Sequence, residues 1–231
     1  MEMWYNSFID RKEKMIKLQE IIDKALLDEQ NSRTPRTRSG KISPSSLGRC
    51  FKYQYWNRKN EPPSNPLEAR TLRIFAAGKL FHNYVEALLP NLQKEVLVET
   101  DDIKGYADIV TEDSVVDIKS HNFGDQRRMW GKTYDIYKEK LNYWLQVALY
   151  AKLLDKPKCG LFFVSKDNLV VDQFESPTSR FKNMLEVELE TLRTHWRGGL
   201  PKGEPRAYGG NECKYCGFAD KCEDKVIKEK K

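Results

Sequence analysis

Acidic residues and a lysine stand close together in two short segments near the middle of the chain. Asp108 lies within Gly105–Val110 and Asp117 within Val115–Lys119. If the second segment is a strand, Asp117 and Lys119 project from one face and the residues between them from the other. Hydrolysis of a phosphodiester needs divalent cations, and carboxylate oxygens are the ligands that these hard cations take. The spacing therefore predicts a cation site shared by the two aspartates, with an ammonium group beside it.

An exposed pair is the alternative for the Asp-x-Lys spacing alone, because charged residues on sheets usually face water. A glutamine in a later apolar segment favours the catalytic interpretation. Gln146 and Tyr150 are spaced i, i+4 within Tyr143–Tyr150, so a helix would place both on one face. A buried glutamine needs polar partners. These two side chains are therefore expected to support the catalytic residues or the substrate.

The order of these residues along the chain resembles a known enzyme family. It is similar to the PD-(D/E)XK nucleases of the RecB type, in which a histidine, an aspartate, an Asp/Glu-x-Lys pair and Gln-x-x-x-Tyr follow one another. The resemblance implies an α/β (α+β) fold with a restriction-endonuclease-like core, a central mixed sheet flanked by helices. The matching residues are His82, Asp108, Asp117, Lys119, Gln146 and Tyr150.

The resemblance also implies a role for each residue. Asp108 and Asp117 would bind Mg²⁺ or Mn²⁺, and the backbone carbonyl of Ile118 would add an oxygen ligand. Lys119 would orient or deprotonate the attacking water and stabilise charge on the phosphate. His82 would contribute a manganese ligand, and a histidine satisfied near the core is the alternative. Position 117 carries Asp where many relatives carry Glu, which the family pattern accepts.

Four of the five cysteines form a pattern typical of a metal centre. Cys213, Cys216 and Cys222 are spaced C-x2-C-x5-C, and Cys50 lies far upstream. Four thiolates hold either zinc or an iron-sulfur cluster, and the spacing does not decide between them. One cysteine before the nuclease core and three after it resembles the iron-sulfur branch of the RecB-like nucleases, which favours a 4Fe-4S cluster that joins the two ends. Cys159 is expected to be a buried core thiol.

A sheet and two helices are needed to position these residues. Strands are predicted over 95–100, 103–111 and 115–120 as an antiparallel meander, and over 160–165 and 169–174 as a later pair. Helices are predicted over 8–27, 66–90, 136–154 and 178–196. Ser43 followed by Pro44 predicts a further short helix through Cys50 and Tyr53. This order of elements indicates an α/β or α+β domain.

Three regions are expected along the chain. Residues 1–42 hold a leading helix and a basic linker, 43–200 the nuclease core, and 201–231 the cysteine-rich iron-sulfur segment and basic tail, which forms one compact domain with the core. The segment 121–133 has no clean period and contains Arg127, Arg128, Met129 and Trp130. We interpret it as a candidate substrate-gating loop, with a disordered surface loop as the alternative.

Composition suits a partner with a phosphate backbone. The 231 residues carry 40 Lys and Arg against 34 Asp and Glu, a formal charge of +6. No stretch approaches the roughly 18 apolar residues of a membrane span, and the N-terminus lacks the pattern of a signal peptide. We therefore expect an intracellular, cytoplasmic protein with no membrane partner, whose cysteines stay reduced and available for metal.

The expected function is that of a metal-dependent DNA exonuclease acting on single strands or DNA ends. Similar proteins occur in CRISPR loci and in viruses, so CRISPR adaptation or recombination proteins are the expected partners. Two alternatives belong to other classes of protein. One is a non-catalytic DNA-binding subunit that retains the nuclease fold, and the other is a zinc-binding protein without nuclease chemistry.

Overall fold

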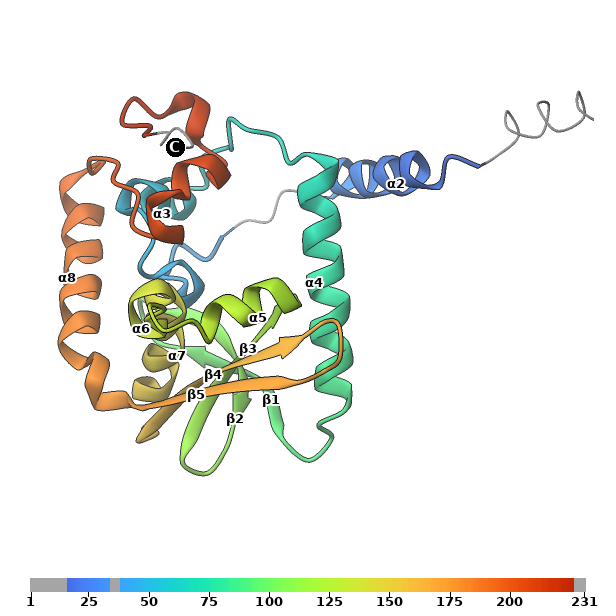
Figure 1. The fold of residues 1–231 in the computed structure, drawn as a ribbon. Helices are drawn as coiled ribbons and strands as arrows, with labels where there is room; N and C mark the ends of the chain where they lie inside the picture. The colour runs from blue at the N-terminus through green and yellow to red at the C-terminus, as the bar shows by residue number, and fades with distance from the viewer. Residues whose placement is uncertain (1–15, 34–37, 227–231) are drawn as a thin grey trace, which may run out of the picture. The chain divides into compact units, whose positions relative to one another are not determined.

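A five-stranded mixed sheet lies at the centre of the fold (Figure 1). In this computed structural model the described residues are 16–33 and 38–226. Strands β1 to β3 form an antiparallel meander, β4 runs parallel to β3, and β5 returns antiparallel to β4. The predicted mixed sheet is therefore confirmed. The strands are β1 Gln93–Glu99, β2 Lys104–Val110, β3 Ser114–His121, β4 Lys158–Ser165 and β5 Val171–Pro177.

Helices cover both faces of this sheet. Helix α7 packs on the face that carries Val115 and Leu161, in the main hydrophobic core. Helix α4 packs on the other face, where Val85 meets Val116 and Ile118. Alternation along β3 produces this division, since successive side chains point to opposite faces. Parallel strands need a long crossover connection, and α5 to α7 supply it between β3 and β4.

The predicted helices form with some changes at their ends. Predicted helix 136–154 is interrupted at Lys140, and the segment expected as a loop after His121 contains α5. The predicted helix from Ser43 through Tyr53 is wrong, because Gly48 turns the chain at φ +70° and α3 starts only after Cys50. The α-helices are α2 Leu18–Ser32, α3 Phe51–Arg58, α4 Ala69–Ala87, α5 Phe123–Met129, α6 Ile136–Glu139, α7 Leu141–Leu153 and α8 Lys182–Gly198.

Short 3₁₀ helices occur mainly in the connections and in the cysteine-rich segment. They are η1 Pro44–Ser46, η2 Thr178–Phe181, η3 Tyr208–Gly210, η4 Glu212–Tyr215 and η5 Ala219–Lys221. The cysteine-rich segment lies beside α3, far away in the sequence (Figure 1), where the Phe218 ring contacts Tyr53 and Trp56. The cysteine-rich segment near the C-terminus and helix α3 near the N-terminus therefore meet in the fold.

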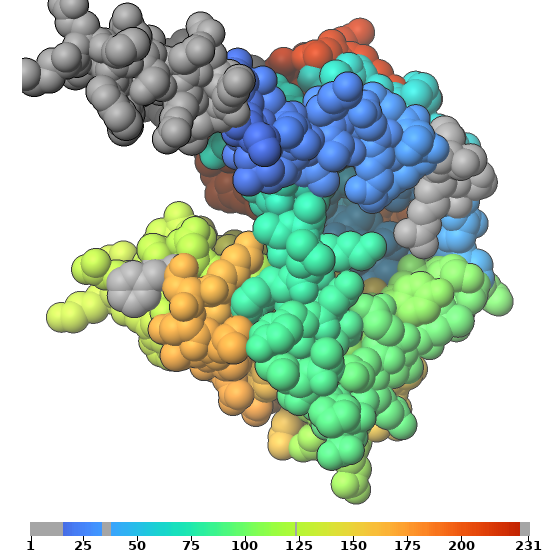
Figure 2. Space-filling model, turned by 90° about the vertical axis from the view of Figure 1, so that its right-hand side faces the viewer, coloured from blue at the N-terminus to red at the C-terminus, as the bar shows by residue number. Residues whose placement is uncertain are grey.

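The chain divides into two units. One contains α2 and the part of α4 up to Ala77, and the other runs from Arg36 to Pro66 and from Gly78 onwards. The predicted leading helix is present from Leu18, while its first residues lie outside the described part of the chain. In the second unit, α4 from Gly78 onwards forms an outer surface beside the β4–β5 hairpin, seen in Figure 2. No helix among the described residues has the length and apolar character that spanning a membrane requires.

Candidate active site

Asp108 and Asp117 lie on neighbouring strands in the same row of the sheet. Ile109 on β2 pairs with Val116 on β3. The next positions in this register are Asp108 and Asp117, and residues opposite each other point to the same face. The Asp108 carboxylate also accepts a hydrogen bond of 2.8 Å from the Ile118 N–H. The structure therefore brings the two predicted aspartates together.

Asp117 is held between a lysine and a glutamine. Its side chain is 3% exposed, and Lys119 Nζ lies 2.6 Å from Oδ2. Gln146 Nε2 donates a hydrogen bond of 2.8 Å to Oδ1. Within the described part of the chain, buried Oδ2 has no hydrogen-bond partner of suitable geometry. Gln146 on α7 thus fixes one oxygen of the carboxylate, and the ammonium group of Lys119 lies beside the other.

Burial and mutual repulsion act on the ionisation of these groups. Burial raises the pKa of Asp117 to about 6, with Lys119 opposing the shift and Asp108 adding to it. Burial also raises the pKa of Asp108, against the charge of Lys119. For Lys119, burial alone would lower the pKa, but Asp117 and Asp108 outweigh it and the pKa rises. The carboxylates thus hold more negative charge than one lysine offsets, which favours a bound cation.

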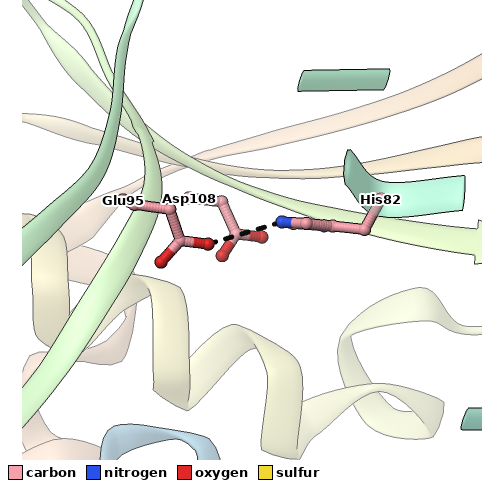
Figure 3. A group of neighbouring side chains, drawn as sticks. All are labelled: His82, Glu95 and Asp108. Carbon is pink, nitrogen blue, oxygen red and sulfur yellow. Dashed lines mark ion pairs between the residues drawn. The ribbon is translucent and has the colours of Figure 1, made fainter. Parts of the chain in front are cut away.

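A histidine and two carboxylates converge beside this pair (Figure 3). One side-chain ligand atom each of His82, Glu95 and Asp108 lies within 4.8 Å of the others. His82 Nε2 is 3.5 Å from Glu95 Oε1 and 3.3 Å from Glu86 Oε1 on the same helix. His82 and Asp108 thus lie close together, and Glu95 and Glu86 lie beside His82.

Glu95 was not predicted, and the structure explains why. The β1–β2 register pairs Lys94 with Ile109 and Val96 with Ala107, which places Glu95 opposite Asp108. Only the pairing of the two strands reveals this neighbourhood. Glu95 also has φ +49°, a conformation that is uncommon for residues other than glycine and recurs at functional sites. Glu86 could have been found, because it stands four residues after His82 on a helix.

The residues present fit a Mg²⁺ or Mn²⁺ ion. Carboxylates from three adjacent strands, Glu95, Asp108 and Asp117, supply hard oxygen ligands, and His82 supplies a nitrogen that manganese accepts. The chemistry of this donor set supports the fit, because the carboxylates outnumber the single lysine that lies beside them. For Ile118 the structure gives the N–H bond to Asp108, while its side chain packs against α4. A ligand role for the Ile118 carbonyl stays a prediction.

Tyrosines of α7 complete the surroundings. Tyr150 is buried, and burial together with Asp117 and Asp108 raises the pKa of its hydroxyl. A Cβ at Gly105 would lie 2.3 Å from that hydroxyl, so a larger residue there would displace the Tyr150 side chain. The Tyr143 ring lies under Lys119, with Nζ 5.1 Å from the ring centroid. Tyr150 and Gln146 thus both face the acidic residues, as the sequence predicts, and Tyr143 is an addition.

The four predicted cluster cysteines line one pocket, and none of the candidate metal ligands His82, Glu95, Asp108 and Asp117 lines it. They are Cys50, Cys213, Cys216 and Cys222, and the Tyr53 and Trp56 rings border the same pocket. Buried Glu212 accepts hydrogen bonds from the backbone N–H of Cys50 at 2.9 and 3.1 Å. The Phe218 N–H donates to Cys216 Sγ at 3.4 Å. Cys159 is fully buried in the core, as predicted.

Comparisons with known proteins bear on the fold. The solved structure of a protein called SSO0001 matches with a TM-score of 0.56 and 20% identity, covering 93% of this chain and 99% of that one. The chain has a restriction-endonuclease-like fold. No family model and no curated protein matches the sequence.

Two exonuclease structures show a weaker likeness. An alkaline exonuclease from Laribacter hongkongensis has a TM-score of 0.48 and 11% identity, with 69% of this chain and 89% of that chain covered. A phage-related exonuclease from Haemophilus somnus has a TM-score of 0.37 and 13% identity, with 51% and 66% covered.

The raised pKa of Asp117 predicts a pH-dependent stability in the absence of metal. An aspartate whose pKa rises on folding, from 3.8 to about 6, binds its proton more tightly in the folded state. Its contribution to stability therefore falls as pH rises through this interval. Asp117→Asn removes the titration, so the stability of this variant relative to wild type should rise by on the order of 1–3 kcal/mol between about pH 4 and pH 7. Thermal unfolding in EDTA measures it, and a pH-independent difference would contradict it.

Proposed function

We propose that this protein is a divalent-metal-dependent nuclease that hydrolyses DNA phosphodiester bonds. The observation that carries the proposal is the buried Asp117 carboxylate, fixed by Gln146 and Lys119, in the same sheet row as Asp108. An exposed ion pair would not require this arrangement. Glu95 and His82 add donors of the type that Mg²⁺ and Mn²⁺ accept.

The proposed roles follow from the positions of the side chains. Asp108, Asp117, Glu95 and His82 would hold the ion, which when bound neutralises the phosphate and lowers the pKa of a water. Lys119, at 26% side-chain exposure, reaches solvent and can orient that water or offset charge that develops on the phosphate. Gln146 fixes the orientation of Asp117, and Tyr150 lies near enough for the charges of Asp117 and Asp108 to raise the pKa of its hydroxyl.

An assay of DNA cleavage tests this proposal. Labelled single-stranded and double-stranded DNA are incubated with Mg²⁺, with Mn²⁺ and with EDTA. We expect cleavage with metal, none in EDTA, and none by Asp117→Ala or Lys119→Ala. No cleavage by wild type under either metal would favour a non-catalytic DNA-binding subunit. Product lengths over time would separate an exonuclease, our proposal, from an endonuclease.

We also propose that the four cysteines hold a structural 4Fe-4S cluster. Tetrahedral zinc would bring the sulfur atoms about 3.8 Å apart, since a Zn–S bond is about 2.3 Å. Among the described residues, no three of these thiols are within 4.8 Å of one another. The aromatic lining of the pocket and the Phe218 N–H that donates to Cys216 suit an iron-sulfur cluster, whose reduction potential depends on hydrogen bonds to its sulfurs.

Elemental analysis of anaerobically purified protein tests the cluster. We expect about four iron atoms and four sulfides per chain, with broad visible absorption that disappears on oxidation. Cys213→Ser should lower the iron content and Cys159→Ser should not, because Cys159 is buried in the core. One zinc and no iron would contradict the proposal. A role in CRISPR adaptation or viral DNA processing is a proposal that follows from the resemblance alone, and a cytoplasmic location is a proposal that follows from the sequence pattern.

A further inference from the structure

Trp130 is an exposed aromatic residue that the sheet holds firmly in place. It follows directly after α5, and its side chain is among the exposed large hydrophobic residues, at 62%. Its indole Nε1 nevertheless donates a hydrogen bond of 2.8 Å to Asp172 on β5. Its ring also lies against Phe174 of the same strand, with centroids 5.6 Å apart and planes 30° apart. A tryptophan in a mobile surface loop would have neither contact.

The residue that anchors Trp130 is itself buried at an energetic cost. The Asp172 side chain is 6% exposed, and its second oxygen lies 3.3 Å from Nε2 of His121, which is 4% exposed. In the described residues, Asp172 Oδ2 and both ring nitrogens of His121 lack a hydrogen bond of suitable geometry. Burying polar groups without hydrogen-bond partners costs folding free energy. The orientation of the indole is the clearest benefit that the structure shows for this cost.

Trp130 is connected to the strand that carries the catalytic residues. Lys119 on β3 is the register partner of Phe163 on β4, and Phe163 is the partner of Asp172 on β5. The three side chains therefore point to the same face, in one row. Two strand spacings, about 10 Å, separate the first backbone from the last. That distance corresponds to about three nucleotides of a stacked strand, and to fewer of an extended one.

We propose that Trp130 is a stacking platform for an unpaired nucleobase of the DNA substrate, a few nucleotides from the bond that is cut. This inference rests on the proposed nuclease function and adds to it a residue that would bind the single-stranded segment of the substrate. Exposed Arg127 and Arg128 stand beside the indole in the sequence and can contact the phosphates of the same strand. Aromatic stacking combined with basic side chains is the way in which proteins bind single strands without sequence preference.

DNA binding, measured separately from cleavage, tests the platform. Fluorescence anisotropy with an oligothymidylate and with a blunt duplex, in Ca²⁺ and in the Asp117→Asn background, avoids degradation. We expect Trp130→Ala to weaken single-strand binding about tenfold or more, as the loss of one base-stacking contact does. Duplex binding should change less, and Trp130→Phe should retain part of the affinity. Tyr84→Ala, a change of a 51% exposed aromatic residue on α4, is the matched control and should leave binding unchanged.

A second experiment measures affinity for oligonucleotides that each carry one abasic site, placed at successive positions. A purely structural role of Trp130 would not make affinity depend on the position of the missing base. For wild type, one or two positions should show a loss of affinity, and in Trp130→Ala this position dependence should disappear. If wild type cuts DNA while Trp130→Ala keeps the affinity of wild type and its dependence on the position of the abasic site, the stacking role of Trp130 is wrong and the nuclease proposal is unaffected. If wild type does not cut but the position dependence requires Trp130, the nuclease is wrong and the platform stands.

Discussion

Asp117→Asn is expected to lower the rate of DNA cleavage about 10³-fold without lowering the melting temperature of the metal-free protein. Asparagine has the shape of aspartate and keeps an oxygen that can accept the hydrogen bond from Gln146. It lacks the charge that binds the cation. Because burial already raises the pKa of Asp117 to about 6, removing its charge costs the fold little near neutral pH. Initial cleavage rates in Mn²⁺ and thermal unfolding in EDTA measure the two effects.

Lys119→Met separates metal binding from the chemical step. Methionine preserves the length of the side chain but cannot orient water or offset phosphate charge, so kcat should fall while Mn²⁺ still raises the melting temperature. Asp117→Asn should instead weaken this thermal shift. Lys158→Met is the control, because Lys158 is 53% exposed and pairs with Asp113 away from the site. Equal loss of cleavage in both lysine variants would show that general basic charge, and not the position of Lys119, matters.

The sequence predicts the parts of this fold whose pattern is local. The three meander strands form within a few residues of their predicted limits, because alternating apolar residues and polar turns determine them. Helix α5 was missed although Asn122 caps its N-terminus, because the contacts that hold its C-terminal end are tertiary. Met129 is buried in the core, and Trp130 is anchored on β5. Neither contact leaves a period in the sequence.

The residues of the candidate site also fall into those that a local pattern predicts and those that depend on tertiary contacts. Strand alternation and motif order, both visible along the chain, predict Asp108, Asp117 and Lys119 as site residues, and the structure places them near one another. Glu95 was missed, because its place beside Asp108 depends on the β1–β2 register and on a positive φ. Tyr143 and the anchor of Trp130 likewise depend on which strands and helices pack together. Contacts between distant segments are therefore what the pattern alone could not supply.

The second large effect is expected from Glu212, which belongs neither to the predicted nuclease residues nor to the four cysteines. Its side chain is 1% exposed and pairs with Arg49 Nε at 3.0 Å. It also accepts hydrogen bonds from the backbone N–H groups of Cys50, Arg206 and Ala207. One carboxylate thus joins the start of α3 to the segment that precedes Cys213. The geometry of the cysteine pocket depends on this junction.

Glu212→Gln should therefore loosen both ends of the nuclease region at once. An amide presents one oxygen to donors that a carboxylate satisfies with two, and it leaves the charge of Arg49 without its buried partner. The expected loss is about 3–5 kcal/mol, on the order of 10 °C in melting temperature, with a lower iron content in the purified protein. Glu190→Gln is the control, because Glu190 is 64% exposed in its pair with Arg197 and such pairs contribute little. If Glu212→Gln unfolded like wild type and kept its iron, the cysteine pocket would have to be held by the thiols and their cluster alone.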